Sequence, residues 1–85
     1  MGYQAGFHGP IGRTDFLGLR TSRQGSTEIV YDDGANQRLI WRVAGEFGEV
    51  ILSDVLQAAV AAQRVLPTLF EELKKRAIQI DRIGA

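Results

Sequence analysis

The sequence contains no cysteine and only one histidine among its 85 residues. The absence of cysteine excludes disulfide bonds, thiolate metal sites and cysteine nucleophiles. The histidine, His8, lies in a glycine-rich segment where Asp15 is the nearest acidic residue. A catalytic histidine needs an oriented partner, and a metal site normally needs several ligands. We therefore expect no metal, no cofactor and no catalytic residue in this chain.

Long apolar runs are also missing. The longest stretch without a polar side chain in the C-terminal third is residues 58–62, whereas a membrane-spanning helix needs ~20 apolar residues. The first residues show no basic segment followed by an apolar core, so no signal peptide is expected. These absences predict a cytoplasmic protein without a membrane partner.

Charge of one sign is not in excess, because ten basic side chains balance ten acidic ones. Residues 1–25 carry three arginines and one aspartate, and residues 26–54 carry two arginines and six acidic residues. Residues 55–85 carry five basic and three acidic residues. Nucleic-acid binding requires a continuous basic face, which this acidic middle interrupts. The pattern favours self-association or a protein partner of mixed charge over a nucleic acid.

The residues that are present suit one small folded domain, since 45% are apolar and 24% are charged. A core of this size is marginal, and oligomerisation is a common remedy. We divide residues 1–85 into three parts, with a break in the last part at Pro67. The parts are a glycine-rich arm over 1–13, a β-meander over 14–52 and a helical region over 53–83.

Three segments of the meander alternate apolar and polar residues with the period of a β-strand: 15–21, 27–32 and 38–44. Glycine-containing turns separate them. A fourth, shorter run at 49–52 follows the turn at 45–48 and is a candidate strand. The sheet is expected to be antiparallel, with its inner face made by Leu17, Leu19, Ile29, Tyr31, Leu39, Trp41, Val43, Val50 and Leu52.

The strand register follows from matching apolar to apolar faces. Val30 opposite Ile40 and Leu19 opposite Ile29 keep every apolar residue of the inner face together, and a one-residue slip would not. This register places opposite charges side by side on the outer face, as a solvated row of Arg20, Glu28 and Arg42.

The C-terminal third is expected to form two helices. Ser53 is a good N-cap for the first, and Pro67 is expected to end it. Thr68 begins a capping box for a second helix, which runs to Ile83 and stops at Gly84. The predicted fold class is α+β, an antiparallel three- to four-stranded β-meander packed on one face by two C-terminal α-helices.

The first predicted helix is apolar on more of its circumference than one sheet can cover. A large exposed apolar surface usually marks an interface, and small residues allow another helix to approach closely. We therefore expect a homodimer or a tight complex with another protein. The contact is predicted at Ala58, Ala61, Ala62 and Val65.

Four side chains are candidates for a ligand or anion site. Arg20 and Arg42 flank Glu28 and are candidates for an anion clamp, although a solvated cross-strand ladder is the more ordinary explanation for them. Trp41 and Tyr31 are candidates for a ligand platform, although aromatic residues on an inner face usually belong to the core.

The leading functional hypothesis is a small non-enzymatic protein-interaction module, such as a regulatory, inhibitor or assembly protein of bacterial or phage type, acting as a homodimer. The alternative is a small-molecule-binding protein with a pocket between sheet and helices. A cavity of at least ~300 Å³ favours that alternative. A third hypothesis is a dimeric enzyme whose site is completed across the subunit interface.

Overall fold

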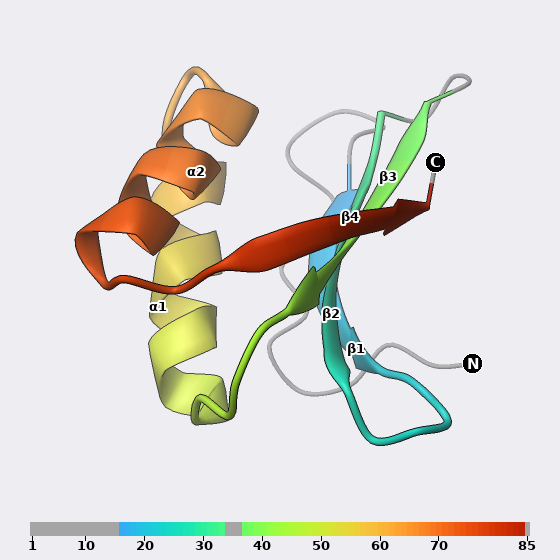
Figure 1. Cartoon of the computed structure of the whole chain (residues 1–85). Helices are drawn as coiled ribbons and strands as arrows, with labels where there is room; N and C mark the ends of the chain where they lie inside the picture. The colour runs from blue at the N-terminus through green and yellow to red at the C-terminus, as the bar shows by residue number, and fades with distance from the viewer. Residues whose placement is uncertain (1–15, 34–36, 85) are drawn as a thin grey trace.

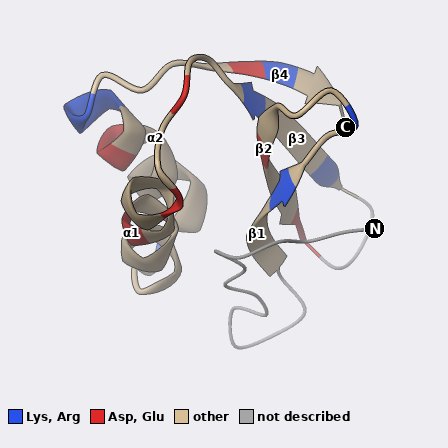
Figure 2. Ribbon diagram, turned by 90° about the horizontal axis from the view of Figure 1, so that it is seen from below, with Lys and Arg blue, Asp and Glu red and all other residues tan. Residues whose placement is uncertain are grey.

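The structure is a computed structural model that describes residues 16–33 and 37–84, so the predicted glycine-rich arm lies outside the described residues. Four antiparallel strands form one sheet in the order β1-β2-β3-β4, and two helices form a second layer on one of its faces (Figures 1 and 2). The predicted α+β fold is confirmed. The elements in chain order are β1 (Phe16–Thr21), β2 (Thr27–Asp32), β3 (Arg38–Val43), α1 (Glu49–Val60), α2 (Val65–Lys75) and β4 (Ile80–Gly84).

The predicted register of the first three strands is confirmed. Leu19 lies opposite Ile29, and Val30 lies opposite Ile40. The first turn also forms where glycine allows it, because Gly25 has a φ of +86°, a conformation that other residues rarely adopt. Matching of apolar faces and of opposite charges is therefore enough to predict the register of these three strands.

The core lies between the sheet and α1. The backbone of α1 approaches β1, and α2 packs on α1. Within residues 16–33 and 37–84, the backbone of α2 lies close to the backbone of α1 but not to that of any strand. The helix α2 therefore reaches the sheet only through its side chains. The buried residues of this core are Leu17, Leu19, Ile29, Tyr31, Leu39, Trp41, Val43, Leu52, Val55, Leu56, Ala59, Leu69, Leu73 and Ile78. No helix in this part of the chain is long and apolar enough to cross a membrane.

The predicted start of the first helix is wrong. The segment 49–52 is not a strand, and Ser53 is not the N-cap, because α1 begins one turn earlier at Glu49. Leu52 repeats at helical spacing with Val55 and the later core residues, so a longer helix buries it. The same helix turns Val50 outward to 75% exposure, against the prediction that it faces the core.

The predicted role of Pro67 is also wrong. Pro67 is the third residue of α2, which begins at Val65, and it does not separate the two helices. The first four amides of a helix have no acceptor within it, so proline is tolerated there. The amide of Thr68, one residue later, donates to the Arg64 carbonyl at 3.2 Å. Thr68 is therefore inside the helix and is not its cap.

The predicted helix to Ile83 ends eight residues early, at Lys75. The Ile78 amide donates to the Leu73 carbonyl at 3.0 Å, and the Ala77 amide donates to the Lys74 carbonyl at 3.0 Å. These two bonds form a Schellman motif, a helix ending that places one residue in the left-handed conformation. That residue is Ala77, with a φ of +57°, where glycine is usual. The chain then reverses and pairs with β3 as β4, which is the fourth strand of the sheet.

We expect Ala77→Gly to raise the free energy of unfolding by about 1 kcal/mol, because glycine adopts the left-handed conformation without the steric cost that alanine meets. Urea denaturation followed by circular dichroism measures the change. Ala58→Gly in the interior of α1 is the matched control, and it is expected to lower the free energy of unfolding by about 1 kcal/mol. A loss of stability with both substitutions would contradict the left-handed assignment.

The sheet face away from the helices is less exposed than predicted. Val30 is fully buried there, and Glu28 is only 4% exposed. The Arg20 Nε donates to the Glu28 carboxylate at 2.6 Å. The predicted row of charges is present in register and extends to Asp81 opposite Arg42 on β4, but its central carboxylate is not solvated.

Candidate functional site: a groove between α2 and β4

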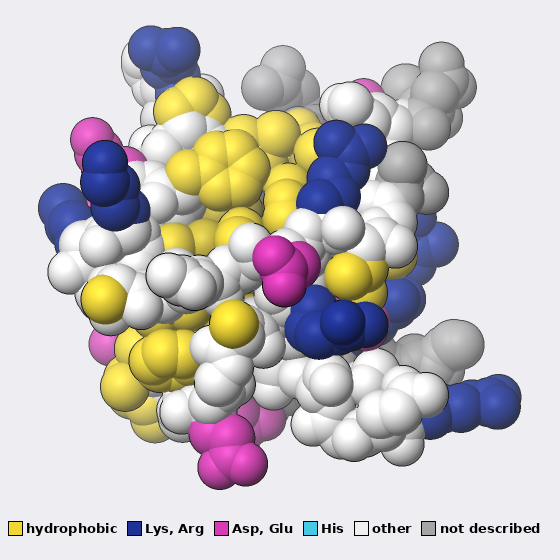
Figure 3. Space-filling model, in the orientation of Figure 1, with side chains coloured by type: hydrophobic (Ala, Val, Ile, Leu, Met, Phe, Trp, Pro, Cys, Tyr) yellow, Lys and Arg dark blue, Asp and Glu magenta, His cyan; other side chains and the backbone are white. Residues whose placement is uncertain are grey.

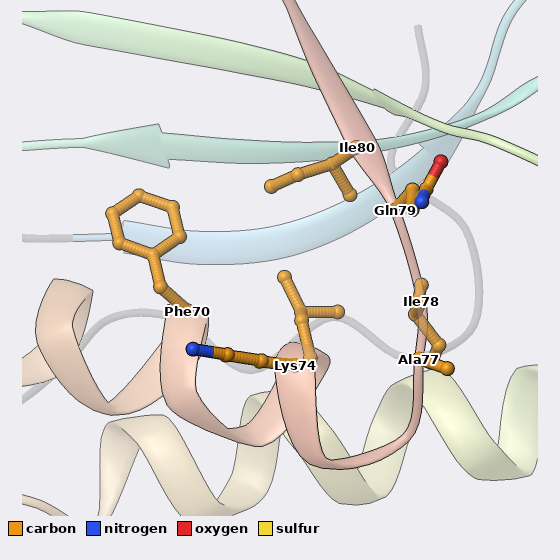
Figure 4. A pocket seen from close by; sticks show the side chains of 7 residues that line it. Phe70, Lys74, Ala77, Ile78, Gln79 and Ile80 are labelled. Atoms are coloured by element: carbon orange, nitrogen blue, oxygen red, sulfur yellow. The ribbon is translucent and has the colours of Figure 1, made fainter.

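A pocket of about 350 Å³ lies where the end of α2 meets the start of β4 (Figure 4). We call this pocket and the adjoining edge of β4 the α2–β4 groove. Its lining comes from one continuous segment of the chain that turns from helix to strand: Phe70, Leu73, Lys74, Ala77, Ile78, Gln79 and Ile80.

The Schellman turn at the end of α2 builds the base of the groove. It brings Leu73 and Ile78 together, and both are buried in the core. Phe70 points from α2 toward the sheet, and Ile80 points from β4 into the space beside it (Figure 4). The groove therefore has an apolar base and two apolar walls, one from a helix and one from a strand.

Phe70 is the most unusual residue of the groove, because a large aromatic side chain on the helix is 43% exposed. The edge of one ring meets the face of the other between Phe70 and buried Trp41, with centroids 5.5 Å apart at an interplanar angle of 83°. Such pairs add about 0.5–1.5 kcal/mol beyond burial and hold the ring in place. Phe70 thus spans the distance between α2 and the sheet and still presents apolar surface outward. Figure 3 shows hydrophobic side chains gathered between α2 and the sheet on this side of the molecule.

The charges beside the groove are positive and in part uncompensated. Glu72 accepts hydrogen bonds from Arg76 at 2.7 Å and from Lys75 at 3.1 Å. The Arg76 bond, and then the Lys75 bond, hold the pKa of the Glu72 carboxyl below its ordinary value. Within the described residues Lys74 makes no ion pair, and its amine extends along the helix toward Phe70 (Figure 4).

The four predicted ligand contacts do not form one site. Trp41 and Tyr31 are buried among core residues on the helix side of the sheet. Arg20 and Arg42 lie on the opposite face, since they sit at alternate positions of the strands. Arg42 lines a second, polar hollow of about 610 Å³ at the turns near Gly25 and Gly45. Only Trp41 reaches the α2–β4 groove, through its contact with Phe70.

The predicted interface residues lie near the end of α1, in the turn that follows it and at the start of α2. Ala61 is exposed in the turn between α1 and α2, whereas Ala58, Ala62 and Val65 are half-buried. Because α2 packs on α1, part of the apolar surface that was expected to need a partner is covered within the chain.

Sequence reasoning missed Phe70 as a site residue, although a signal was present. Leu69 and Phe70 are adjacent apolar residues on one helix, and a helix directs neighbours about 100° apart. Only one of them can point directly into the core. Leu69 is fully buried, so Phe70 lies at the margin.

The groove offers an apolar surface and the Lys74 cation, which suit an apolar group that carries a negative charge. Residues 16–33 and 37–84 contain no group of three or more histidine, cysteine or carboxylate side chains placed to hold a metal ion. Fold and groove together define a small α+β protein with an apolar groove at the edge of its sheet. Comparison of the chain with protein-family models, curated proteins and solved structures finds no match.

Proposed function

We propose that this protein is a small non-enzymatic protein-interaction module, of a regulatory, inhibitor or assembly type, that binds its partner through the α2–β4 groove. The observation that carries the proposal is Phe70, a half-exposed aromatic ring held against Trp41 beside an apolar pocket. Aromatic residues anchored beside pockets dominate the binding energy of many interfaces. A partner's apolar side chain buried in such a pocket contributes about 1.5–3 kcal/mol.

We expect Phe70→Ser to weaken binding of the partner at least about tenfold, because an aromatic anchor of this kind is worth about 2 kcal/mol or more. Peptides selected from a phage-displayed random library against the wild-type protein serve as partners, and fluorescence anisotropy measures their affinity. Val50→Ser is the matched control, since it removes an exposed apolar side chain outside the groove. A set of selected peptides that bind both variants equally well would contradict the proposal, provided circular dichroism shows both variants folded.

A small-molecule-binding protein is the second candidate, and the pocket volume is the observation that favours it. About 350 Å³ lies at the lower end of the range for small-ligand pockets. Titration with 2-naphthoate, an aromatic acid suited to Lys74 and Phe70, tests this candidate by NMR chemical shifts. Saturable micromolar binding in the pocket would favour it over the interaction module, and no shifts at millimolar concentration would reject it.

The proposal also includes a homodimer formed at the turn between α1 and α2, where Ala61 is exposed. We expect Ala61→Arg to convert dimer to monomer, because a long charged side chain prevents close approach of two alanine-rich surfaces. Light scattering at micromolar concentration measures the mass. A mass of 9.4 kDa for the unsubstituted chain would contradict the dimer and leave the groove unaffected.

A further inference from the structure

We propose, resting on the function proposed above, that the occupant of the α2–β4 groove is an extended segment of another protein that carries one carboxylate. It adds to the edge of β4 as a fifth strand. It places one apolar side chain in the pocket beside Phe70 and one carboxylate on the cations of the groove.

The position of β4 favours strand addition. It is one of the two edge strands of the described sheet, and its residues 81–83 are exposed. An edge strand presents unpaired backbone donors and acceptors, which an extended peptide can complete. A strand added beside β4 lies about 4.8 Å away and continues the alternation of side chains between the two faces.

The face that looks toward α2 is defined by pairing with β3. Ile80 lies opposite Val43, and Arg82 lies opposite Trp41, both of which belong to the core. An added strand therefore presents side chains to α2 next to Ile80 and next to Arg82. These two positions are two residues apart, so one partner side chain enters the pocket and the second lies beside a guanidinium.

The positive charges on this face favour a carboxylate on the partner. Within the described residues neither Lys74 nor Arg82 makes an ion pair. The Arg82 guanidinium has one weak bond, to the Gly84 carbonyl at 3.4 Å. Lys and Arg side chains flank the hydrophobic surface in Figure 3, on the α2 side and on the sheet side. A partner carboxylate supplies the missing opposite charge.

The opposite face of β4 adds a further condition. The residue between the two partner positions lies beside Asp81, so a second acidic residue there is disfavoured. The preferred segment is thus an apolar residue, a basic or neutral residue and an acidic residue in succession, read in either chain direction.

A second copy of this chain is a poor occupant of the same edge. Two copies of β4 related by a twofold axis pair antiparallel, and residues that face the same side then lie opposite each other. The register that pairs the whole of β4 is centred on Arg82 and sets Arg82 against its own copy. Like charges opposite each other disfavour pairing, so this edge selects a different partner.

Synthetic heptapeptides, acetylated and amidated, test the inference on the full chain. The first peptide carries leucine, lysine and aspartate, in this order, at its centre, and the second carries the same three residues in the reverse order. Valines and threonines flank the three central residues in both peptides. Matched peptides replace the aspartate with lysine, or N-methylate the backbone on the edge that meets β4. Fluorescence of Trp41, the only tryptophan, reports binding, and ¹⁵N chemical shifts of β4 amides report its place.

We expect the better of the two aspartate peptides to bind about tenfold more tightly than its lysine counterpart, and N-methylation to abolish binding. Arg82→Gln is expected to remove most of this preference, whereas Lys75→Gln, on the same end of the molecule but paired with Glu72, is expected to leave it unchanged. Equal binding of aspartate and lysine peptides, equal binding after N-methylation, or no binding at millimolar concentration would overturn the inference.

The outcomes separate this inference from the proposed function. Library-selected peptides that require Phe70 but are helical or lack a carboxylate would overturn the extended partner and leave the interaction groove intact. Failure of every selected peptide to require Phe70 would overturn both.

Discussion

Leu56→Ala is expected to lower the free energy of unfolding by about 2–5 kcal/mol. Leu56 has no exposed surface and lies on α1 within the core that the sheet and the helices share. The substitution removes three carbon atoms from that core and leaves a cavity, because α1 is held between β1 and α2 and cannot move inward freely. A chain of this length has roughly 4–13 kcal/mol of total stability, so the loss is a large fraction of it.

Urea denaturation followed by Trp41 fluorescence and by circular dichroism measures this loss. Val50→Ala on the same helix is the control, because Val50 is largely exposed and alanine favours a helix. It is expected to change stability by less than about 0.5 kcal/mol. Equal losses at the two positions would mean that α1 is rotated about its axis relative to this structure.

Arg20→Met is expected to lower the free energy of unfolding by about 3 kcal/mol, because it leaves the Glu28 carboxylate buried without its partner. The Arg20 Nε lies 2.6 Å from the Glu28 Oε1, and the Glu28 side chain is almost fully buried. The value is placed at the lower end of the range for buried pairs because the Arg20 side chain is 31% exposed.

A double substitution separates the cost of an unpaired charge from the value of the pair. Arg20→Met combined with Glu28→Leu is expected to recover most of the lost stability, since an apolar pair of similar size often replaces a buried ion pair at little cost. Lys75→Met is the matched control at an exposed ion pair with Glu72, and it is expected to leave the urea midpoint nearly unchanged. If Arg20→Met also has no effect, Glu28 is solvated and the sequence-based prediction of an exposed ladder was right.

The strands show how much a local pattern can determine. Alternation of apolar and polar residues predicted β1, β2 and β3, and the need to keep Ile29 and Trp41 on one face predicted their register. A one-residue slip would place an apolar face against a charged one, and the pairing of opposite charges favours the observed register over larger slips, so the choice needs only the sequences of these strands.

The C-terminal third shows where local sequence patterns fail to predict the structure. Proline and a capping box favoured a new helix at Thr68, but the first turn of α2 accommodates Pro67. No glycine marks the end of α2, because Ala77 takes the left-handed position that glycine usually occupies. The residues of β4 do not alternate strictly between apolar and polar, and a bulge interrupts its pairing with β3. Without that alternation, the sequence of this segment resembles the end of a helix more than a strand.

The α2–β4 groove arises from these same unpredictable features. Its lining residues come from one segment of the chain, but helix and strand meet at a pocket only because Ala77 reverses the chain and β4 pairs with the outer edge of β3. Phe70 becomes a site residue only because Trp41 lies across from it on a strand 29 positions earlier in the sequence.

The sequence by itself determined the α+β class, the three-stranded meander and its register, because these depend on alternation and on charge pairing between neighbouring strands. Only the tertiary structure decided the burial of Glu28, the strand identity of Ile80–Gly84 and the exposure of Phe70. These depend on which surfaces of distant segments meet, and the energy differences among the choices are small until the whole core is assembled.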